Sequence, residues 1–252
     1  MNIFVTNRLA SNQYHEIMEL VECAAKADGT HGISFLEQEL NAIEEFPCFY
    51  MMYDGSRLVS YLSVFIPENS QCEIYSATLP EERGKDYFKR LLSEALTHIR
   101  KYGIEEKFIV SEPDSKDMGD YPEKIGAKHI DTDHLMSYDV NVKPEPQKIL
   151  KLVHRKVEST EIYETYRDDK KIGGCHVEFT RSQAVIHGFM IEEDERGKGY
   201  GTETLLLILK HLLKNDAPKI LLHVNDANKA AHAMYSHHGF VSEQQIDYWK
   251  LP

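Results

Sequence analysis

The stretch Ile191-Glu-Glu-Asp-Glu-Arg-Gly-Lys-Gly-Tyr-Gly-Thr202 decides the fold of the second half of this chain. A strand pattern over Ala184–Ile191 leads into it, and an amphipathic helical pattern follows it. Gly197, Gly199 and Gly201 leave no side chains where a backbone must approach a ligand. Because successive free amides at the start of a helix bind anions, the stretch predicts a strand, a phosphate-binding loop and a helix in that order.

Charged and hydroxyl side chains accompany these glycines. Arg196 and Lys198 supply positive charge suited to a pyrophosphate, and Thr202 can donate a hydroxyl. The acidic run Glu192–Glu195 is expected to be a solvated turn. Two other kinds of phosphate loop are excluded, because the Walker pattern is absent and Thr204 stands where a dinucleotide-binding GxGxxG pattern needs its last glycine.

The chain contains an internal repeat with a constant offset in residue number, called here the repeat offset. This offset carries Glu82-Arg83-Gly84-Lys85 onto Glu195-Arg196-Gly197-Lys198, and it carries Gly126 onto Gly239. Apolar helical positions between these points also coincide. Because one offset holds from Glu82 through Gly126, the two halves are interpreted as diverged copies of one fold.

Hydrophobic periodicity and turn signals predict a similar order of elements in both halves. In the first half we expect helices at Gln13–Lys26 and Phe35–Glu45, and a hairpin about Asp54-Gly55. In the second half we expect hairpin strands at Glu161–Arg167 and Gly173–Thr180, a helix ending near Asp216, a strand at Lys219–Val224, a helix at Ala227–His237 and a final strand pair within Phe240–Leu251.

Two motifs in the second half resemble those of a known family. Arg196-x-x-Gly199-x-Gly201 is similar to the acyl-CoA signature of the GCN5-related N-acetyltransferase (GNAT) superfamily. The later segment from Leu222 to Phe240, with Asn228, Ala231 and Tyr235 in it, is similar to that family's late strand, helix and turn. The resemblance covers roughly Glu161–Leu251 well and the first half only in outline.

The resemblance implies an α/β (α+β) fold of two tandem units, each a mixed, mostly antiparallel sheet flanked by helices. We expect a degenerate GNAT-like domain at residues 1–143 and an acyl-CoA-binding GNAT domain at 147–252. Between them the two prolines of Asn141-Val-Lys-Pro-Glu-Pro-Gln-Lys148 favour an extended linker, with the boundary near Pro144–Gln147.

The resemblance also implies the reaction. The family transfers an acetyl group from acetyl-CoA directly to an amine, here of a small molecule or a protein. Tyr235 matches the tyrosine that protonates the departing CoA thiolate, and Asn228 matches the residue that contacts pantetheine, although Asn is also a good helix N-cap. Residues expected to bind the cofactor are Phe189, Ile191, Arg196, Gly197, Lys198, Gly199, Tyr200, Gly201, Thr202, Asn228 and Ala231.

The general base is the least defined part of the site. Many relatives carry a carboxylate on the strand before the phosphate loop, but Ala184–Ile191 contains none. His187 is the titratable residue of that strand, so it is the expected base, with a structural histidine as the alternative. His223 on the next strand is its rival. Cys175 is expected to be a buried thiol and not a nucleophile.

The first half lacks features that the second half has. The repeat offset places Asp86 at the position of Gly199 and Phe88 at that of Gly201, so a carboxylate and a ring stand where phosphates need room. Pro122 occupies the position of Tyr235. The first half is therefore expected to be a degenerate copy that does not bind CoA.

Composition narrows the class of protein. The net charge of -12 argues against nucleic acid as a partner and favours a cationic or neutral acceptor. No apolar run is long enough for a membrane span, and the start shows no signal pattern, so a cytoplasmic location is expected. The four cysteines show no metal-ligand spacing, and no metal is expected. Oligomeric state is open.

Two further classes of function compete with catalysis. In the first, the chain is a CoA-binding sensor or scaffold without turnover. In the second, it is purely structural and CoA does not raise its melting temperature. Turnover of acetyl-CoA against amines separates an enzyme from both.

Overall fold

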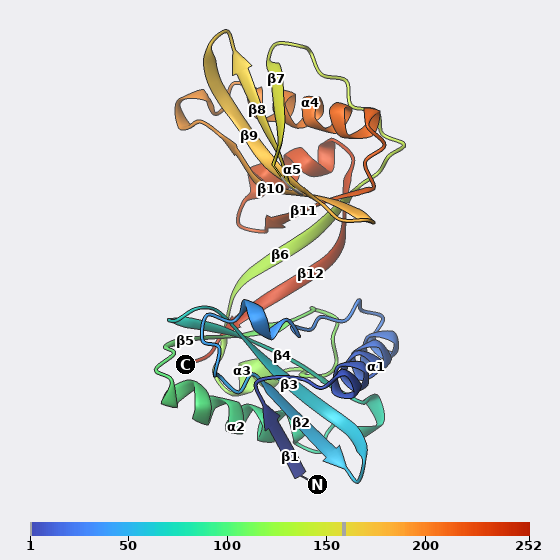
Figure 1. Ribbon diagram of the computed structural model, residues 1–252, viewed down its shortest axis with the longest axis vertical. Coiled ribbons are helices and arrows are strands. Elements are labelled where there is room, and N and C mark those ends of the chain that lie inside the picture. The colour runs from blue at the N-terminus through green and yellow to red at the C-terminus, as the bar shows by residue number, and fades with distance from the viewer. Residues whose placement is uncertain (1, 158–159) are drawn as a thin grey trace. The chain divides into compact units, whose positions relative to one another are not determined.

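The computed structural model describes residues 2–157 and 160–252, which form two compact units (Figure 1). Unit 1 extends to Thr132 and includes the C-terminal Ile246–Pro252, whereas unit 2 comprises Asp133–Gln245. The C-terminal segment belongs to unit 1 because Asp247–Lys250 pairs with a strand of that unit. The domain boundary predicted near Pro144–Gln147 stays a prediction about which segments fold independently.

Unit 1 is a mixed sheet with helices against it. Its strands follow the order β1-β2-β3-β4-β5, with β4 and β5 parallel and the other neighbours antiparallel, and the end of β12 pairs antiparallel with β5. The elements are β1 (Asn2–Thr6), α1 (Ser11–Asp28), η1 (Gln38–Leu40), β2 (Phe49–Asp54), β3 (Arg57–Glu68), β4 (Gln71–Thr78), η2 (Pro80–Glu82), α2 (Tyr87–Lys101), β5 (Glu106–Ser111) and α3 (Tyr121–Lys124).

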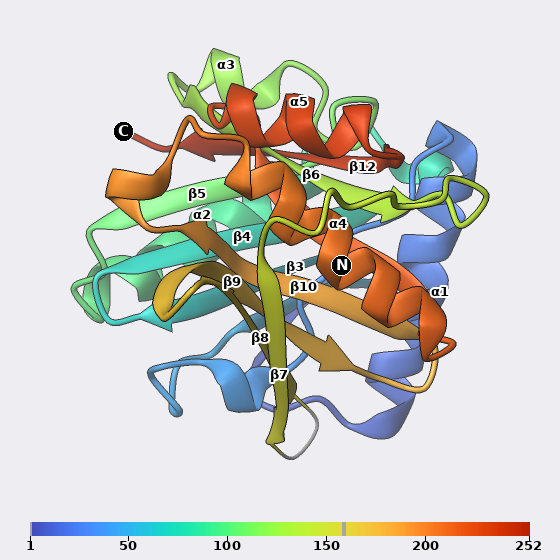
Figure 2. The same ribbon diagram turned by 90° about the horizontal axis from the view of Figure 1, so that it is seen from above.

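Unit 2 repeats this plan with the strand order β6-β11-β10-β9-β8-β7, in which β10 and β11 are parallel. Helix α4 lies across β7, β9 and β10 (Figure 2). The first strand, β6 (Lys128–Tyr138), begins in unit 1, and the last, β12 (Phe240–Lys250), ends in unit 1. The elements between them are β7 (Lys151–Val157), β8 (Thr160–Arg167), β9 (Lys170–Phe179), β10 (Gln183–Ile191), η3 (Glu193–Glu195), α4 (Tyr200–Lys214), β11 (Lys219–Asn225) and α5 (Lys229–His237).

The repeat found in the sequence is present in the structure. The repeat offset carries η2 onto η3, both ends of α2 onto those of α4, and the first residue of β5 onto that of β11. The predicted hairpin of unit 2 is confirmed as β8 and β9, with Asp168 in the left-handed conformation at the turn (φ 53°).

The helix predicted over Phe35–Glu45 is wrong, because the structure has only the short η1 turn there. Phe35 stacks on Phe65 of β3 with ring centroids 4.1 Å apart. Asn41 Oδ1 accepts a hydrogen bond from the Ile66 amide of the same strand at 2.6 Å. These contacts with β3 outweigh the helical periodicity, as tertiary contacts often do.

The strand pair predicted within Phe240–Leu251 is also wrong. The segment forms the single strand β12. Its sequence holds no Gly or Pro that would open a turn, and its last residues find a partner in β5 of unit 1.

Each unit has its own hydrophobic core. In unit 1, α1 and α2 bury apolar faces against β3 and β4. In unit 2, Leu205, Ile208, Leu209 and Leu212 of α4 are buried against the strands, and each contributes roughly 1.5–3 kcal/mol by leaving water. No helix among the described residues is both long and apolar enough to cross a bilayer.

Candidate active site

The predicted phosphate loop connects β10 to α4 through the η3 turn. Arg196 is extended, and Gly197 (φ 73°) and Gly199 (φ 81°) take the left-handed conformation that glycine adopts without strain. Gly199 is the N-cap of α4. The local sequence therefore folds as expected, because the glycines reverse the chain direction immediately before the helix begins.

Six consecutive backbone amides of this loop are available to bind an anion. Within the described part of the chain, the N–H groups of residues 197–202 have no hydrogen-bond partner, whereas the next amide, that of Glu203, donates to Gly199 O. The first amides of a helix carry partial positive charge from the helix dipole. A row of such donors at a solvent-exposed loop is suited to a diphosphate.

The charged side chains of the loop differ in their availability. Arg196 is exposed, and its Nε donates to Ile191 O at 3.0 Å. Lys198 Nζ donates to Asp194 O at 2.8 Å and to Glu195 Oε2 at 3.0 Å, so it closes the η3 turn. Arg196 is thus the more available of the two cations for a phosphate.

The expectation that Glu192–Glu195 is a fully solvated turn is wrong for its last residue. Glu195 is buried and accepts hydrogen bonds from Lys170 and Lys198. These bonds hold the pKa of Glu195 below its usual value, and the bond from Lys170 has the larger effect. The ion pairs fix η3 against β9, which positions the loop that follows.

Strand β10 is irregular just before the loop. Its pairing with β9 breaks between His187 and Met190, where Gly188 has a φ of 57°. Its parallel pairing with β11 extends only over Gln183–Ile186 and Lys219–Leu222 among the described residues. The edge of β10 that leads to the phosphate loop is therefore open on the β11 side.

On its other edge, β11 pairs antiparallel with β6 over Leu221–Asn225. This pairing continues past Leu222, where the pairing with β10 ends. Parting strands leave backbone donors and acceptors on β10 available to an extended ligand, as in β-augmentation. Phe189 and Ile191, expected to contact the cofactor, lie on this open stretch.

Tyr235 lies close to the same stretch of β10. Its ring contacts Phe189 edge-on with centroids 6.0 Å apart, and it also contacts Phe240. The residue is buried. Burial is the main cause that raises the pKa of Tyr235 to about 12, and the nearby Cys175 contributes less. A phenol in this state is protonated at neutral pH and can donate its proton to a developing thiolate.

Asn228 has the capping role that was expected as the alternative to contact with the cofactor. Asn228 Oδ1 accepts a hydrogen bond from the Ala231 amide at 3.2 Å, so it is the N-cap of α5. Gly201 lies near Met234 of α5. A Cβ atom built on Gly201 would be 3.5 Å from the sulfur of Met234. The loop, β10 and α5 therefore converge.

The two histidines considered as bases are on neighbouring strands. His187 is exposed, and its Nε2 lies 3.6 Å from Glu178 Oε2. His223 is also exposed. Desolvation by surrounding atoms is the main cause that lowers the pKa of His223. The charge of Asp133 raises this pKa, and the charge of His187 lowers it. Cys175 is a buried thiol as expected, and burial raises its pKa to about 12.

Sequence comparison identifies the family. The profile of the acetyltransferase (GNAT) family matches this chain twice, over residues 14–127 and 130–240. The chain belongs to the GNAT family. The match includes the first half, which the motifs resembled only in outline. No curated protein matches the chain.

Solved structures share the GNAT fold over both units. A GCN5-related N-acetyltransferase from Sphaerobacter thermophilus superposes with a TM-score of 0.81 at 12% identity, covering 99% of this chain and 96% of that one. A tandem GNAT protein from the clavulanic acid biosynthesis pathway gives 0.68 at 14% identity, with 99% and 98% covered. A GCN5-related glucosamine N-acetyltransferase region of a fungal multi-domain GH3 beta-N-acetylglucosaminidase gives 0.70 at 12% identity, with 99% and 38% covered.

The GNAT loop of unit 1 keeps the backbone geometry but changes the surface. Gly84 (φ 76°) and Asp86 (φ 59°) repeat the conformations of Gly197 and Gly199. Phe88 is buried at the position of Gly201. The left-handed loop conformation is thus present in both GNAT units, while Asp86 and Phe88 replace two of the glycines in unit 1.

The loop arginine of unit 1 is already neutralised. Arg83 Nη1 donates to Asp28 Oδ1 at 2.7 Å, and its Nε lies 3.8 Å from Asp117 Oδ1. Both carboxylates are buried, and Arg83 and Asp117 border a cavity of about 190 Å³ together with Tyr121. Failure of unit 1 to bind CoA stays a prediction, which these contacts support.

One supporting group of the GNAT site was not predicted from the sequence. Glu203, buried in the first turn of α4, accepts hydrogen bonds from the amides of Gln147 and Ile149 at 2.7 and 3.0 Å. Tyr200, which was predicted to bind the cofactor, is buried and packs against Leu150 and Ile172. A buried Glu in the first turn of a helix has no signature in a single sequence.

Proposed function

We propose that unit 2 is an N-acetyltransferase that transfers the acetyl group of acetyl-CoA directly to an amine. Membership of the GNAT family already implies acyl transfer in general. The observation that carries the finer proposal is the run of six unbonded amides at residues 197–202, placed directly after the open edge of β10. A diphosphate on the loop leaves the pantetheine arm to extend along that edge.

The residues present fit the chemistry of the thioester. Backbone N–H groups at the break in β10, about Gly188, are suited to stabilise the oxyanion that develops when the amine attacks the carbonyl. The buried phenol of Tyr235 donates its proton to the thiolate as the carbon–sulfur bond breaks. The amine must be unprotonated before it attacks, and its proton passes to a base, for which His187 is proposed and His223 is the rival.

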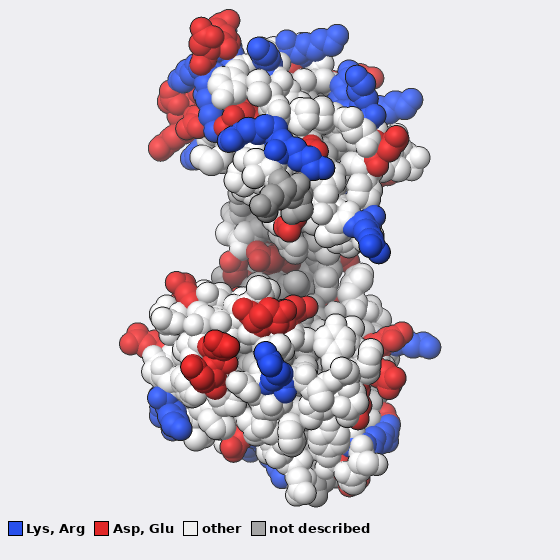
Figure 3. All heavy atoms as spheres, in the orientation of Figure 1, with Lys and Arg blue, Asp and Glu red and all other residues white. Residues whose placement is uncertain are grey.

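Charge supports a cationic or neutral acceptor. The chain carries a net charge of -12, and Lys and Arg side chains do not cover a continuous surface on the face in Figure 3. Such a charge balance attracts amines and repels polyanions. The amine is a small molecule or a protein amino group.

Turnover is the test of the proposal. Acetyl-CoA is incubated with the full chain and a panel of a polyamine, glucosamine and a lysine-containing peptide, and free thiol is measured. Tyr235→Phe is expected to lower kcat about 10²–10⁴-fold and leave the Kd for CoA nearly unchanged, because the hydroxyl acts only as the thiolate departs. Tight CoA binding without turnover of any acceptor would instead support the sensor function.

A further inference from the structure

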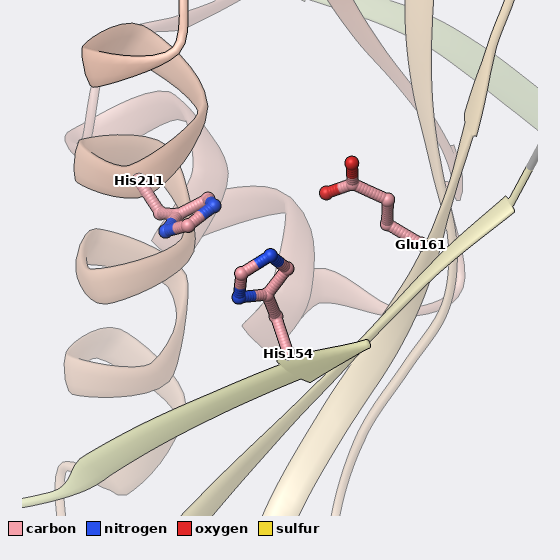
Figure 4. A group of neighbouring side chains, drawn as sticks. All are labelled: His154, Glu161 and His211. Carbon is pink, nitrogen blue, oxygen red and sulfur yellow. The ribbon is translucent and has the colours of Figure 1, made fainter. Parts of the chain in front are cut away.

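A cluster of three metal-ligating side chains lies on the surface of unit 2, outside the GNAT loop. His154 comes from β7, Glu161 from β8 and His211 from the last turn of α4. One donor atom from each lies within 4.8 Å of the other two. Figure 4 shows the two rings and the carboxylate facing a common space, and the imidazole centroids are 4.3 Å apart.

Strand register explains why the first two residues share a face. His154 is directly opposite Tyr163, and Lys156 is directly opposite Glu161. Residues opposite each other, and residues two apart on a strand, point to the same side of a sheet. Helix α4 packs on that side, since Thr204 in its first turns shares a hydrogen bond of 2.8 Å with Thr165 of β8. His211 is therefore brought to the cluster by the helix.

Tyr163 forms the floor of the cluster. Its hydroxyl donates to Glu161 Oε2 at 2.5 Å, and its ring stacks on His154 and meets His211 edge-on. The residue is 1% exposed, so its position is fixed by packing. A hydrogen bond to a carboxylate and a ring under the two imidazoles orient the three donors, as outer-shell groups do in metal sites.

Unit 1 provides an internal comparison. The repeat offset carries Tyr50 and His98 onto Tyr163 and His211. In unit 1 the two side chains simply share a hydrogen bond of 3.1 Å between Tyr50 Oη and His98 Nδ1. The tyrosine and histidine pair is thus common to both units and needs no metal to explain it.

The other two donors exist only in unit 2. Val5 is opposite Tyr50, as His154 is opposite Tyr163. Cys48, which donates to Asn7 O, stands at the position of Glu161. In unit 2 the hydroxyl of Tyr163 donates instead to the carboxylate of Glu161, and the ring of His211 lies beside the ring of His154. Both differences supply donor atoms, and both converge on one point.

We propose that His154, Glu161 and His211 bind a divalent transition-metal cation of the zinc type. Two imidazole nitrogens and one carboxylate oxygen suit zinc, cobalt, nickel or copper better than magnesium or calcium, which prefer oxygen ligands. The end of α4 carries partial negative charge, which also favours a cation. Metal–ligand bonds of about 2.0–2.1 Å require the donors to close in, and His154 is exposed and able to turn.

The cation would join β7 and β8 to the last turn of α4, and water would complete its coordination. The sequence offers no signature of this site, because its three ligands come from separate elements, and His211 lies far along the chain from the other two. The spacing of the cysteines led us to expect no metal, and the proposed site departs from that expectation.

The test uses the full chain after removal of metal with a chelator. Zn²⁺ is titrated calorimetrically, and Co²⁺ is titrated while its visible absorption is recorded, since tightly held tetrahedral or five-coordinate Co²⁺ gives strong bands. We expect one site per chain. Glu161→Gln, which keeps the shape of the side chain, and His154→Ala are each expected to weaken binding at least 10-fold.

His98→Gln is the matched control, because it removes the histidine at the equivalent helix position in unit 1. It is expected to leave Zn²⁺ affinity within twofold of that of the unmodified chain. Circular dichroism establishes that each variant is folded. Equal Zn²⁺ affinity in the unmodified chain and in folded Glu161→Gln and His154→Ala, or no stoichiometric site in the unmodified chain, overturns the proposal.

Discussion

At the scale of single residues, Gly199 and Asp86 show how one position separates the two copies. Both take the left-handed conformation as the N-cap of a helix. A Cβ at Gly199 would meet no protein atom within 4 Å, so no clash within the protein excludes a side chain there. The difference between the units at this point is the negative charge of Asp86, which stands at a helix start that otherwise attracts anions.

This comparison leads to a paired prediction for unit 2. Gly199→Asp is expected to weaken CoA binding at least 10-fold more than Gly199→Asn does, because the carboxylate repels the diphosphate at close range. Both side chains tolerate the left-handed conformation, so the two variants share the backbone cost of about 1–2 kcal/mol. Calorimetric titration with CoA checks the difference, and equal affinities in the two variants would show that charge is unimportant there.

The base is also decided by single residues. His187→Gln is expected to lower kcat/KM about 10²–10⁴-fold and to remove the acid limb of the pH profile, because a base must be unprotonated to act. His223→Gln is the matched variant on the next strand and should have the smaller effect.

The direction of the pKa shift of His223 gives a further test of its role. Its pKa lies below the usual value, so, if it were the base, activity would rise with pH below about 6.5. Loss of activity in His223→Gln together with an acid limb in that low range would assign the base to His223.

At the scale of elements, the start of α5 allows the capping role of Asn228 to be tested apart from its proposed contact with the cofactor. Asn228 caps α5 through its side-chain oxygen. Asn228→Ala is expected to cost about 1 kcal/mol of stability, whereas Asn228→Ser restores most of it because a serine hydroxyl also caps. Urea unfolding measures this difference.

The same pair of variants tests contact with the cofactor. If Asn228 also binds pantetheine, Asn228→Ser will keep its stability and still have a raised KM for acetyl-CoA. A KM equal to that of the unmodified protein in Asn228→Ser would leave capping as the function of this residue.

At the scale of the whole molecule, the two GNAT units are expected to differ in ligand binding. One CoA per chain is predicted, because the loop arginine of unit 1 pairs with Asp28 and approaches Asp117, and a phenylalanine, Phe88, replaces Gly201. Titration of the full chain gives the stoichiometry directly. Binding of two CoA molecules, with one site surviving Gly199→Asp, would show that unit 1 has kept its function.

Much of the fold could be predicted because it depends on local patterns. Each of these patterns lies within a short segment: the glycines of the loop, the periodicity of α4, and the motif that begins at Glu82 and again at Glu195. The structure confirms the elements that these patterns predicted. The failures were tertiary. Phe35–Glu45 has helical periodicity, but contacts with β3 decide its conformation, and the end of β12 takes its partner from β5, far away in the sequence.

The sequence alone therefore determined the family, the repeat and the conformation of the loop before α4, because backbone conformation and apolar spacing depend on adjacent residues. Only the tertiary structure placed Tyr235 against Phe189, buried Glu195 between two lysines, and assembled His154, Glu161 and His211. Such groupings depend on strand register and on which helix covers which face. Distances between side chains from separate elements are set by packing, and no local pattern encodes them.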